Sequence, residues 1–238
     1  SAPGWVRAGS VGDMPTLLHI DSSADLSHSR SRALTAAFAD AWRARGPEYT
    51  VVRRDLHVDQ LPHLESSALH WAAADRTADE TVAPEADALR QEVIDELLAA
   101  DVVVVGAPLY NYTVPSTLKA WIDRIHVPGI LTGGVQPLAG RPVVTVVSRG
   151  ATYDAGTPTE GWDHGSPVLH IVLGTALGMK LYPITVSATL ADRLPDLAPL
   201  ADHAAAEFAD AKTTIERLAT TECQKLAGKL GPAGNTGQ

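Results

Sequence analysis

The chain has 238 residues, of which 45% are hydrophobic and 20% are charged, so it is long enough to bury the core of an ordinary globular protein. Its 19 Lys and Arg residues against 28 Asp and Glu residues give a net charge of −9, which argues against nonspecific binding to nucleic acid or to an anionic membrane. A single cysteine, Cys223, excludes an internal disulfide framework and a cysteine-ligated iron–sulfur cluster. No apolar run approaches the roughly 20 residues that span a bilayer, and residues 1–13 lack the hydrophobic centre of a signal peptide, so we expect a cytoplasmic protein.

The two ends of the sequence differ in composition from the rest. Residues 1–15 show no periodic pattern, which predicts a disordered or tag-like extension. Residues 227–238 are polar and rich in glycine, which predicts a flexible tail. We therefore expect one domain over residues 16–226.

Within this domain, apolar runs rich in β-branched residues alternate with stretches of helical period. The predicted strands are residues 16–20, 50–56, 101–107, 141–148 and 181–188. The first predicted helix carries an apolar stripe from Leu34 to Trp42, at spacings of three and four, and ends before Gly46. The later helices are predicted over residues 84–100, 115–125, 168–177 and 200–226. Residues 57–82 carry charges and prolines and are predicted to be an excursion from this repeat.

Five βα units in succession predict an α/β fold with a doubly wound, five-stranded parallel sheet and helices on both faces. The strand order 2-1-3-4-5, the flavodoxin-like arrangement, is the solution we expect. The third strand should be central, because its VVVV run can stay apolar only if both of its faces are buried. Ligands of such sheets bind outside the carboxyl ends of the strands, which selects the loops 21–30, 108–114 and 148–164.

The loop after the first predicted strand reads DSSADLSHSRSR. It lacks the glycine pattern of a dinucleotide fingerprint or a Walker loop, but it places several serine hydroxyls directly before a helix. Hydroxyls together with the free N–H groups of a helix start can bind a phosphate, and Arg30 or Arg32 could add positive charge. Alternatively, Ser27 or Ser29 only caps the helix.

The other two loops carry aromatic and amide groups. Four successive residues offer the flat apolar surface and the amides that a flavin ring needs: Leu109, Tyr110, Asn111 and Tyr112. The alternative is an ordinary turn between strand and helix. In the loop after the fourth strand, Gly150 could bring backbone N–H groups to the ring because glycine tolerates a positive φ, whereas Arg149 could equally be a surface charge.

Residues 108–123, PLYNYTVPSTLKAWID, resemble the signature of the FMN-dependent NADH azoreductase and NAD(P)H quinone reductase family. The segment Ser148-Arg149-Gly150 is similar to the S-R-G-G loop of that family, and Ser22-Ser23 and Ser27-His28-Ser29 resemble its phosphate loop. With Asp163-His164 and Leu173-Gly174, the resemblance covers roughly residues 15–218.

The resemblance implies a homodimer with one noncovalent FMN per subunit and an active site shared across the interface. It also implies NADH or NADPH as cosubstrate and a two-step transfer of hydride through the flavin to a small aromatic acceptor, namely a quinone, an azo compound or a polycyclic natural product. Carried over by position, the cofactor-binding residues are Ser23, Ser27, His28 and Ser29 in the first loop, Pro108, Leu109, Tyr110, Asn111 and Tyr112 in the second, and Ser148, Arg149, Gly150 and Ala151 in the third.

Three positions depart from the family pattern. Ala151 replaces a glycine, residues 129–134 replace a stretch that supplies aromatic side chains, and Ala176-Leu177-Gly178 replaces a typical F-I-G. Two aromatic walls of the acceptor pocket are therefore missing, which predicts a wider pocket and a bulky acceptor. Trp162 falls in the loop after the fourth strand and is the better candidate of the irregularly placed tryptophans to line that pocket.

Two other functions fit the same fold. One is a tailoring enzyme that isomerises, dehydrates or cyclises a natural product, for which His164, Asp163, Tyr153 and His28 are candidate acid–base groups. The other is an electron carrier of the flavodoxin type. For hydride transfer the flavin itself carries the chemistry, and no protein group is assigned as catalytic with certainty; the candidates are Tyr112, His164 and Tyr153.

The histidines do not predict a metal site. His57 and His63 lie six residues apart, as do His164 and His170, and neither pair has the i, i+4 spacing of a helical zinc site.

Overall fold

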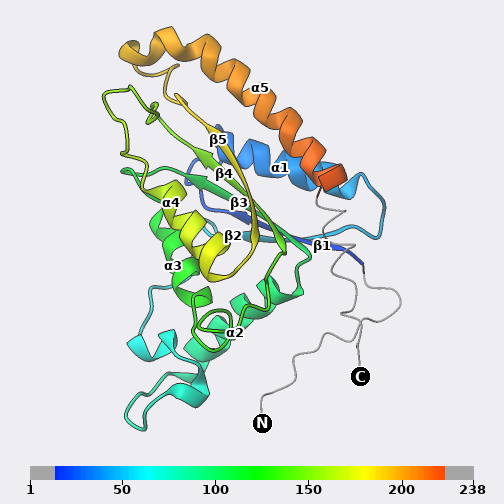
Figure 1. The fold of residues 1–238 in the computed structure, drawn as a ribbon, viewed down its shortest axis with the longest axis vertical. Coiled ribbons are helices and arrows are strands. Elements are labelled where there is room, and N and C mark those ends of the chain that lie inside the picture. The colour runs from blue at the N-terminus through cyan, green and yellow to red at the C-terminus, as the bar shows by residue number, and fades with distance from the viewer. Residues whose placement is uncertain (1–13, 223–238) are drawn as a thin grey trace.

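The computed structural model describes residues 14–222. Five parallel strands form one sheet in the order β2-β1-β3-β4-β5 (Figure 1). The strands are β1 (Thr16–Asp21), β2 (Thr50–Asp55), β3 (Val102–Pro108), β4 (Pro142–Ser148) and β5 (Lys180–Val186). The predicted fold class, strand order and strand positions are confirmed. The extension at residues 1–13, the tail at 227–238 and the end of the last predicted helix lie outside the described residues.

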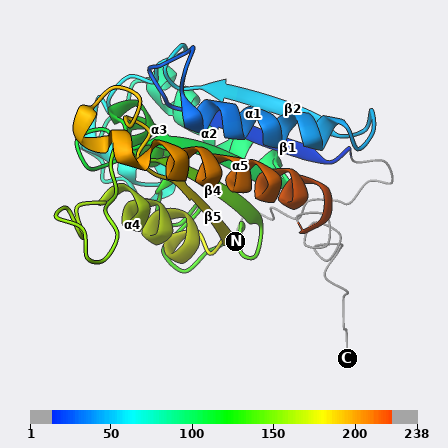
Figure 2. The same cartoon turned by 90° about the horizontal axis from the view of Figure 1, so that it is seen from above.

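Helices cover both faces of the sheet, as Figures 1 and 2 show. They are α1 (Arg30–Arg43), α2 (Pro84–Ala99), α3 (Ser116–Ile125), α4 (Gly165–Leu169) and α5 (Ala201–Arg217). Helices α1 and α5 bury their apolar side chains against one face of the sheet, and α2, α3 and α4 pack against the other. Within residues 14–222, no helix combines the length and the apolar character needed to cross a bilayer.

The core confirms the expected central strand. Every residue of β3 and of β4 is buried, whereas β2 and β5 at the two edges are partly exposed. Trp42 and Trp121 are 1% and 0% exposed, one on each side of the sheet, so the apolar stripes of α1 and α3 face the core as predicted. Burial of both faces explains why β3 tolerates no alternation of polar and apolar residues.

Two helices differ from the prediction. The helix expected over 168–177 begins at Gly165, because the Asp163 carboxylate accepts the N–H groups of Gly165 and Ser166 at 3.0 and 2.9 Å. From His170 to Ala176 it continues as a π-helix, η3. The last helix also ends in a π-helical segment, η5 (Leu218–Glu222), and is preceded by a 3₁₀ segment, η4 (Pro195–Leu200).

The excursion predicted between β2 and α2 is confirmed and contains only two 3₁₀ turns, η1 (Ser67–His70) and η2 (Ala73–Asp75). It is tied to α2 by the buried Arg90, which donates to the carbonyls of Leu69 and Trp71 at 3.1 and 2.6 Å. A guanidinium bound to backbone carbonyls holds the irregular chain against the domain.

Candidate cofactor site

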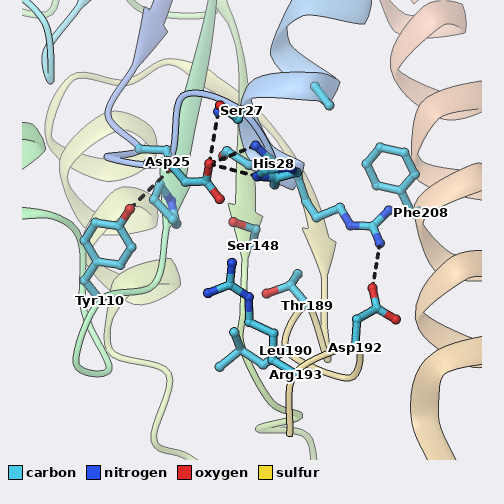
Figure 3. A pocket seen from close by; sticks show the side chains of 15 residues that line it. Asp25, Ser27, His28, Tyr110, Ser148, Thr189, Leu190, Asp192, Arg193 and Phe208 are labelled. Carbon is cyan, nitrogen blue, oxygen red and sulfur yellow. Dashed lines mark hydrogen bonds and ion pairs between the residues drawn. The ribbon is translucent and has the colours of Figure 1, made fainter. Parts of the chain in front are cut away.

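A cavity of about 570 Å³ opens at the carboxyl edge of the sheet (Figure 3). Its walls come from the loops after β1, β3 and β5, from the ends of β3 and β4, from the start of α1 and from α5. The lining residues are Ser23, Asp25, Ser27, His28, Ser29, Arg30, Ala33, Pro108, Tyr110, Ser148, Thr189, Leu190, Asp192, Arg193 and Phe208. The volume falls within the range of about 300–1,000 Å³ typical of small-molecule sites.

The loop after β1 presents a helix start to this cavity. Ser29 is the N-cap of α1, and its hydroxyl accepts the N–H of Arg32 at 3.3 Å, as the capping alternative predicted. The N–H groups of Ser27 and His28 donate to the Asp25 carboxylate at 3.0 and 2.8 Å. By contrast, the N–H groups of Arg30 and Ser31 have no acceptor among residues 14–222. Capping and anion binding are therefore compatible, because the first turn of α1 keeps free donors.

The cations at the cavity are Arg30 and Arg193. Arg30 lines the cavity over the Phe208 ring, 4.8 Å from its centroid, and its Nη2 lies 3.8 Å from an Asp192 oxygen. Arg193 reaches in from the loop after β5, and Figure 3 shows its side chain directed toward Ser148. Arg32, the other arginine considered from the sequence, does not line this cavity.

Arg32 instead lies behind the loop, in a buried group of charges. Its guanidinium donates to both Asp55 oxygens at 2.7 and 2.8 Å and, from Nε and Nη2, to the Ser23 carbonyl at 3.0 and 2.6 Å. Hydrogen bonding to Arg32 lowers the pKa of Asp55 to about 2, so this carboxylate stays charged at neutral pH. The Asp55 hydrogen bond also raises the pKa of Arg32.

The Asp21 carboxylate joins the same group of charges. Burial raises its pKa, but His19, Thr35 and Arg32 together outweigh burial, so the pKa of Asp21 lies below its usual value. The Thr35 hydroxyl donates to Asp21 at 2.7 Å, and His19 Nε2 lies 3.1 Å from the other Asp21 oxygen. These partners keep a second negative charge beside Arg32.

The loop after β3 forms a tight turn over Tyr110–Thr113. Tyr110 and Thr113 exchange backbone hydrogen bonds of 2.9 and 3.2 Å, and the two central residues are left-handed, Asn111 with φ 48° and Tyr112 with φ 72°. Left-handed conformations at both central positions are the pattern of a type I′ turn. The Tyr110 hydroxyl accepts the Ala24 N–H at 2.9 Å and lies 3.3 Å from Ser23 Oγ. These contacts join the β3 turn to the loop after β1.

The loop after β4 corrects the expected role of glycine. Neither Gly150 nor Ala151 has a positive φ. A Cβ at Gly150 would lie 2.8 Å from Leu190 Cδ1, so the Leu190 side chain, which is 39% exposed, would have to shift. The N–H groups of Gly150 and Ala151 have no acceptor within the described part of the chain, so they remain free to donate.

Arg149 is neither a surface charge nor directed to the cavity. It is 7% exposed, and its guanidinium donates to Ser187 Oγ at 2.7 and 3.2 Å and to the Asp154 carboxylate at 2.9 and 3.1 Å. An Asp163 oxygen lies 3.6 Å from the same guanidinium. Arg149 therefore ties the loop after β4 to the end of β5.

The structure brings about half of the predicted cofactor-binding residues together around the cavity. Those that line it are Ser23, Ser27, His28, Ser29, Pro108, Tyr110 and Ser148, whereas Leu109, Asn111, Tyr112, Arg149, Gly150 and Ala151 lie outside its lining. The sequence reasoning missed Thr189, Leu190, Arg193 and the α5 residue Phe208. Thr189, Leu190 and Arg193 could have been predicted, because they follow β5, which ends at the same edge of the sheet as the other parallel strands.

Next to the β3 turn lies an exposed group of aromatic rings. Tyr112 contacts Trp162 edge-to-face with ring centroids 5.3 Å apart and Tyr153 at 6.3 Å. Tyr112 and Trp162 are 45% and 47% exposed. We call Tyr112, Tyr153 and Trp162 the aromatic group.

Among the acid–base candidates, burial raises the pKa of the Tyr153 phenol, which therefore stays protonated at neutral pH. His164 is exposed and donates its backbone N–H to the Tyr112 carbonyl at 2.8 Å. The His28 side chain is 81% exposed, 3.8 Å from Asp25. Among residues 14–222, no three His, Cys, Asp or Glu side chains gather in a way that could hold a metal ion.

Comparison with known proteins places the chain in a family. The sequence profile of a family described as having a flavodoxin-like fold matches residues 15–213. A protein of Kineococcus radiotolerans named FMN-dependent NADH:quinone oxidoreductase is 64% identical over 209 residues, which cover 87% of this chain and 100% of that relative. A protein of the same name from Streptomyces coelicolor is 40% identical over 218 residues, 91% of this chain and 97% of that relative.

Solved structures agree on the fold. An azoreductase from Bacillus anthracis superposes with a TM-score of 0.70 at 21% identity, covering 87% of this chain and 99% of the other. An FMN-dependent NADH-azoreductase of the same species, determined in complex with FMN, gives a TM-score of 0.69 at 17% identity, covering 87% of this chain and 100% of the other. The chain therefore belongs to the flavodoxin-like family and, within it, to the FMN-dependent NADH:quinone oxidoreductases.

Proposed function

We propose that this protein binds FMN at the carboxyl edge of its sheet and uses it to transfer electrons from NADH to a quinone. The observation that carries the proposal is the cavity beside the free N–H groups of α1, in a chain 64% identical to a protein named for that activity. The donors at one end of this cavity match a phosphate, and its size suits a ligand as large as a mononucleotide.

The residues present fit the cofactor. The free N–H groups of α1, the hydroxyls of Ser23, Ser27 and Ser29, and the guanidinium of Arg30 supply donors and positive charge for the phosphate. His28, Pro108, Tyr110 and Ser148 would line the middle of the site. We assign the ring to the backbone of the β3 turn and of the β4 loop, over Leu109, Asn111, Tyr112, Arg149, Gly150 and Ala151. Arg149 would hold the β4 loop in place without donating to the ring, since its guanidinium is held by Ser187 and Asp154 and its backbone N–H donates to the Val186 carbonyl at 2.8 Å.

When bound, the flavin supplies the hydride chemistry, so the protein need provide only position and electrostatics. The loop after β1 holds the phosphate end in place. Asn111 and Tyr112 are both left-handed, so the backbone of the β3 turn has a fixed conformation that an extended chain does not adopt. This turn would support the ring. The N–H groups of Gly150 and Ala151, which have no acceptor among residues 14–222, would donate to the ring from the opposite loop. No acid–base side chain is needed for the hydride transfer itself.

The visible spectrum of the purified protein tests this proposal. A flavin absorption band should be present or appear after FMN is added, bleach under anaerobic NADH, and return when a quinone is supplied. NADPH at the same concentration should bleach it more slowly if NADH is the natural donor. A colourless protein that does not take up FMN would contradict the proposal.

We propose that the acceptor is a bulky aromatic quinone that packs against the aromatic group. Tyr112 and Trp162 expose edge-to-face rings beside the β3 turn, and such surfaces favour flat aromatic ligands. Polycyclic quinones should be reduced with a higher kcat/KM than benzoquinone, and Trp162→Ala should remove most of that difference. A preference for the smallest quinone would contradict this assignment.

We also propose that the protein is a homodimer, as the family resemblance implies. Exposed apolar side chains, among them Tyr112 and Trp162 beside the β3 turn and Ile171 on η3, support an additional buried contact. Sedimentation equilibrium should give twice the mass of the 25.1 kDa chain. A monomer at micromolar concentration would contradict the dimer without affecting the FMN proposal.

A further inference from the structure

The Arg32 side chain forms four hydrogen bonds behind the loop after β1, yet it does not line the cavity. Its guanidinium joins the Ser23 carbonyl of the loop on one side and the Asp55 carboxylate of β2 on the other. We infer that Arg32, held by Asp55, is a positioning residue that sets the phosphate-binding conformation of the loop after β1. The inference rests on the proposed function, and it assigns the role to a residue that does not line the cavity.

The contact with Ser23 is specific in geometry. Arg32 directs both Nε and Nη2 at the same carbonyl oxygen, at 3.0 and 2.6 Å. Ser23 is only 2% exposed, and its hydroxyl accepts the Asp25 N–H at 3.2 Å and lies 3.3 Å from the Tyr110 hydroxyl. Fixing this carbonyl therefore fixes how the Ser23 side chain and the following residues enter the cavity.

The other side of the guanidinium is anchored to the sheet. Asp55 ends β2 and also accepts the N–H groups of His57 and Val58 at 3.2 and 3.3 Å, so its own position is determined by backbone. Arg53 Nη2 lies 3.3 Å from Asp55 and 3.2 Å from Asp21. Asp21 and Asp55 thus pair with Arg32 and Arg53. These ion pairs hold the Arg32 guanidinium in place, so it is not available to bind a phosphate directly.

Lysine cannot replace arginine in this role. The planar guanidinium forms two parallel bonds to a carboxylate and still has donors in a fixed direction for the Ser23 carbonyl, whereas an ammonium is a single point with no such fork. The variant Arg32→Lys keeps the charge but loses the geometry. A loss caused by this variant therefore reports on positioning and not on net charge.

The chain contains a matched control on β2, next to Asp55. Arg54 of β2 donates to both oxygens of Glu96 at 2.6 Å each, and its side chain is 11% exposed against 10% for Arg32. Arg54 and Glu96 lie on the α2 side of the sheet and contact no residue of the loop after β1. Arg54→Lys removes a similar bidentate pair without touching the phosphate loop.

The test compares FMN with riboflavin, which has the same ring but no phosphate. Dissociation constants for both are measured by flavin fluorescence on wild type, Arg32→Lys and Arg54→Lys. We expect Arg32→Lys to weaken FMN binding by about tenfold or more and riboflavin binding by no more than about twofold, and Arg54→Lys to leave the ratio of the two constants unchanged. At saturating FMN, kcat with NADH should stay within about twofold of wild type, since the ring site is not altered.

Equal weakening of FMN and riboflavin in Arg32→Lys, or an unchanged FMN constant, would overturn the inference. Asp55→Asn provides a second route if Arg32→Lys does not fold, because it keeps the side-chain shape and should reproduce the selective loss of FMN affinity. Failure of the proposed function is recognised separately, since wild type would then not bind FMN at all.

Discussion

The two ends of the proposed flavin site are built in opposite ways. At the phosphate end, the supporting residues Ser23 and Arg32 are buried, and both of their side chains are hydrogen-bonded to neighbours, although Ser27 and His28 at the surface of the loop are exposed. At the ring end, Tyr110, Tyr112 and Trp162 are 38%, 45% and 47% exposed. The buried end can hold one ligand in one place, while the exposed end is open to molecules that come and go. An enzyme that keeps its cofactor and exchanges two substrates needs this division.

The largest expected effect concerns a residue of the ring end that is itself buried. Arg149→Met should lower the free energy of unfolding by about 3 kcal/mol, because Asp163 and Ser187 lose a buried charged partner. FMN affinity should change by less than about threefold, since the guanidinium does not face the cavity. Urea denaturation and FMN titration measure the two quantities. Arg43→Met is the control, because the Arg43 side chain is 53% exposed, and it should lower the free energy of unfolding by well under 1 kcal/mol. A large loss of FMN affinity with little destabilisation in Arg149→Met would show that the Arg149 side chain contacts the ring.

Acid should weaken the phosphate end through Asp55. Its pKa is about 2 in the folded protein against a usual 3.8, so the stabilisation is complete above pH 3.8 and is lost as the pH falls through about 2. The difference corresponds to about 2 kcal/mol. The gap in unfolding free energy between wild type and Asp55→Asn should therefore narrow by about that amount between pH 5 and pH 2 in urea titrations. A gap that does not depend on pH would show that the Arg32 pair contributes nothing to stability.

Ser29 allows capping and phosphate binding to be separated. Ser29→Ala should destabilise the protein by about 1 kcal/mol through loss of the N-cap and should also weaken FMN binding. Ser29→Asp restores a good cap but adds a negative charge next to the phosphate, so thermal stability should recover while FMN affinity falls further. Thermal unfolding without cofactor and FMN titration provide the readouts. Recovery of both properties in Ser29→Asp would argue that Ser29 has no contact with the phosphate.

The smallest expected effect tests the rigidity of the ring end. Asn111→Gly should raise the free energy of unfolding by at most about 0.5 kcal/mol, because asparagine already tolerates the left-handed φ of 48°. Asn111→Ala at the same position should lower it by about 1 kcal/mol, since alanine does not. Urea denaturation of both variants is the measurement. Equal stability of the two would show that the turn relaxes to another conformation.

The sheet was predictable because its signals are local and redundant. The VVVV run of β3 can only be a doubly buried strand, and the apolar stripes that contain Trp42 and Trp121 define helices that must pack on the sheet. The start of α4 was missed because the capping carboxylate, Asp163, lies before a glycine and a proline, which read as a loop. Periodicity predicted the type and the approximate position of each element more accurately than its first and last residues.

The site was harder to predict because the sequence identifies residue types but not the direction of side chains. Ser23, Ser27 and Ser29 were placed correctly by the rule on strand ends, whereas Arg149 was expected at the ring and proved to be turned toward Ser187. Gly150 was interpreted through its backbone freedom, although its φ is not positive and its nearest neighbour is the Leu190 side chain, from a loop forty residues away. Contacts between distant loops leave no periodic signal.

The walls of the cavity are drawn from both ends of the described chain, from Ser23 near its beginning to Phe208 near its close. A molecule bound there would contact both the loop after β1 and helix α5, and would therefore stabilise the contact between these two distant segments. At a free concentration one hundred times its dissociation constant it would add about 2.7 kcal/mol to the stability of the whole domain. The cellular lifetime of this protein would then follow the supply of vitamin B2, with newly made chains surviving longest where the nucleotide is plentiful.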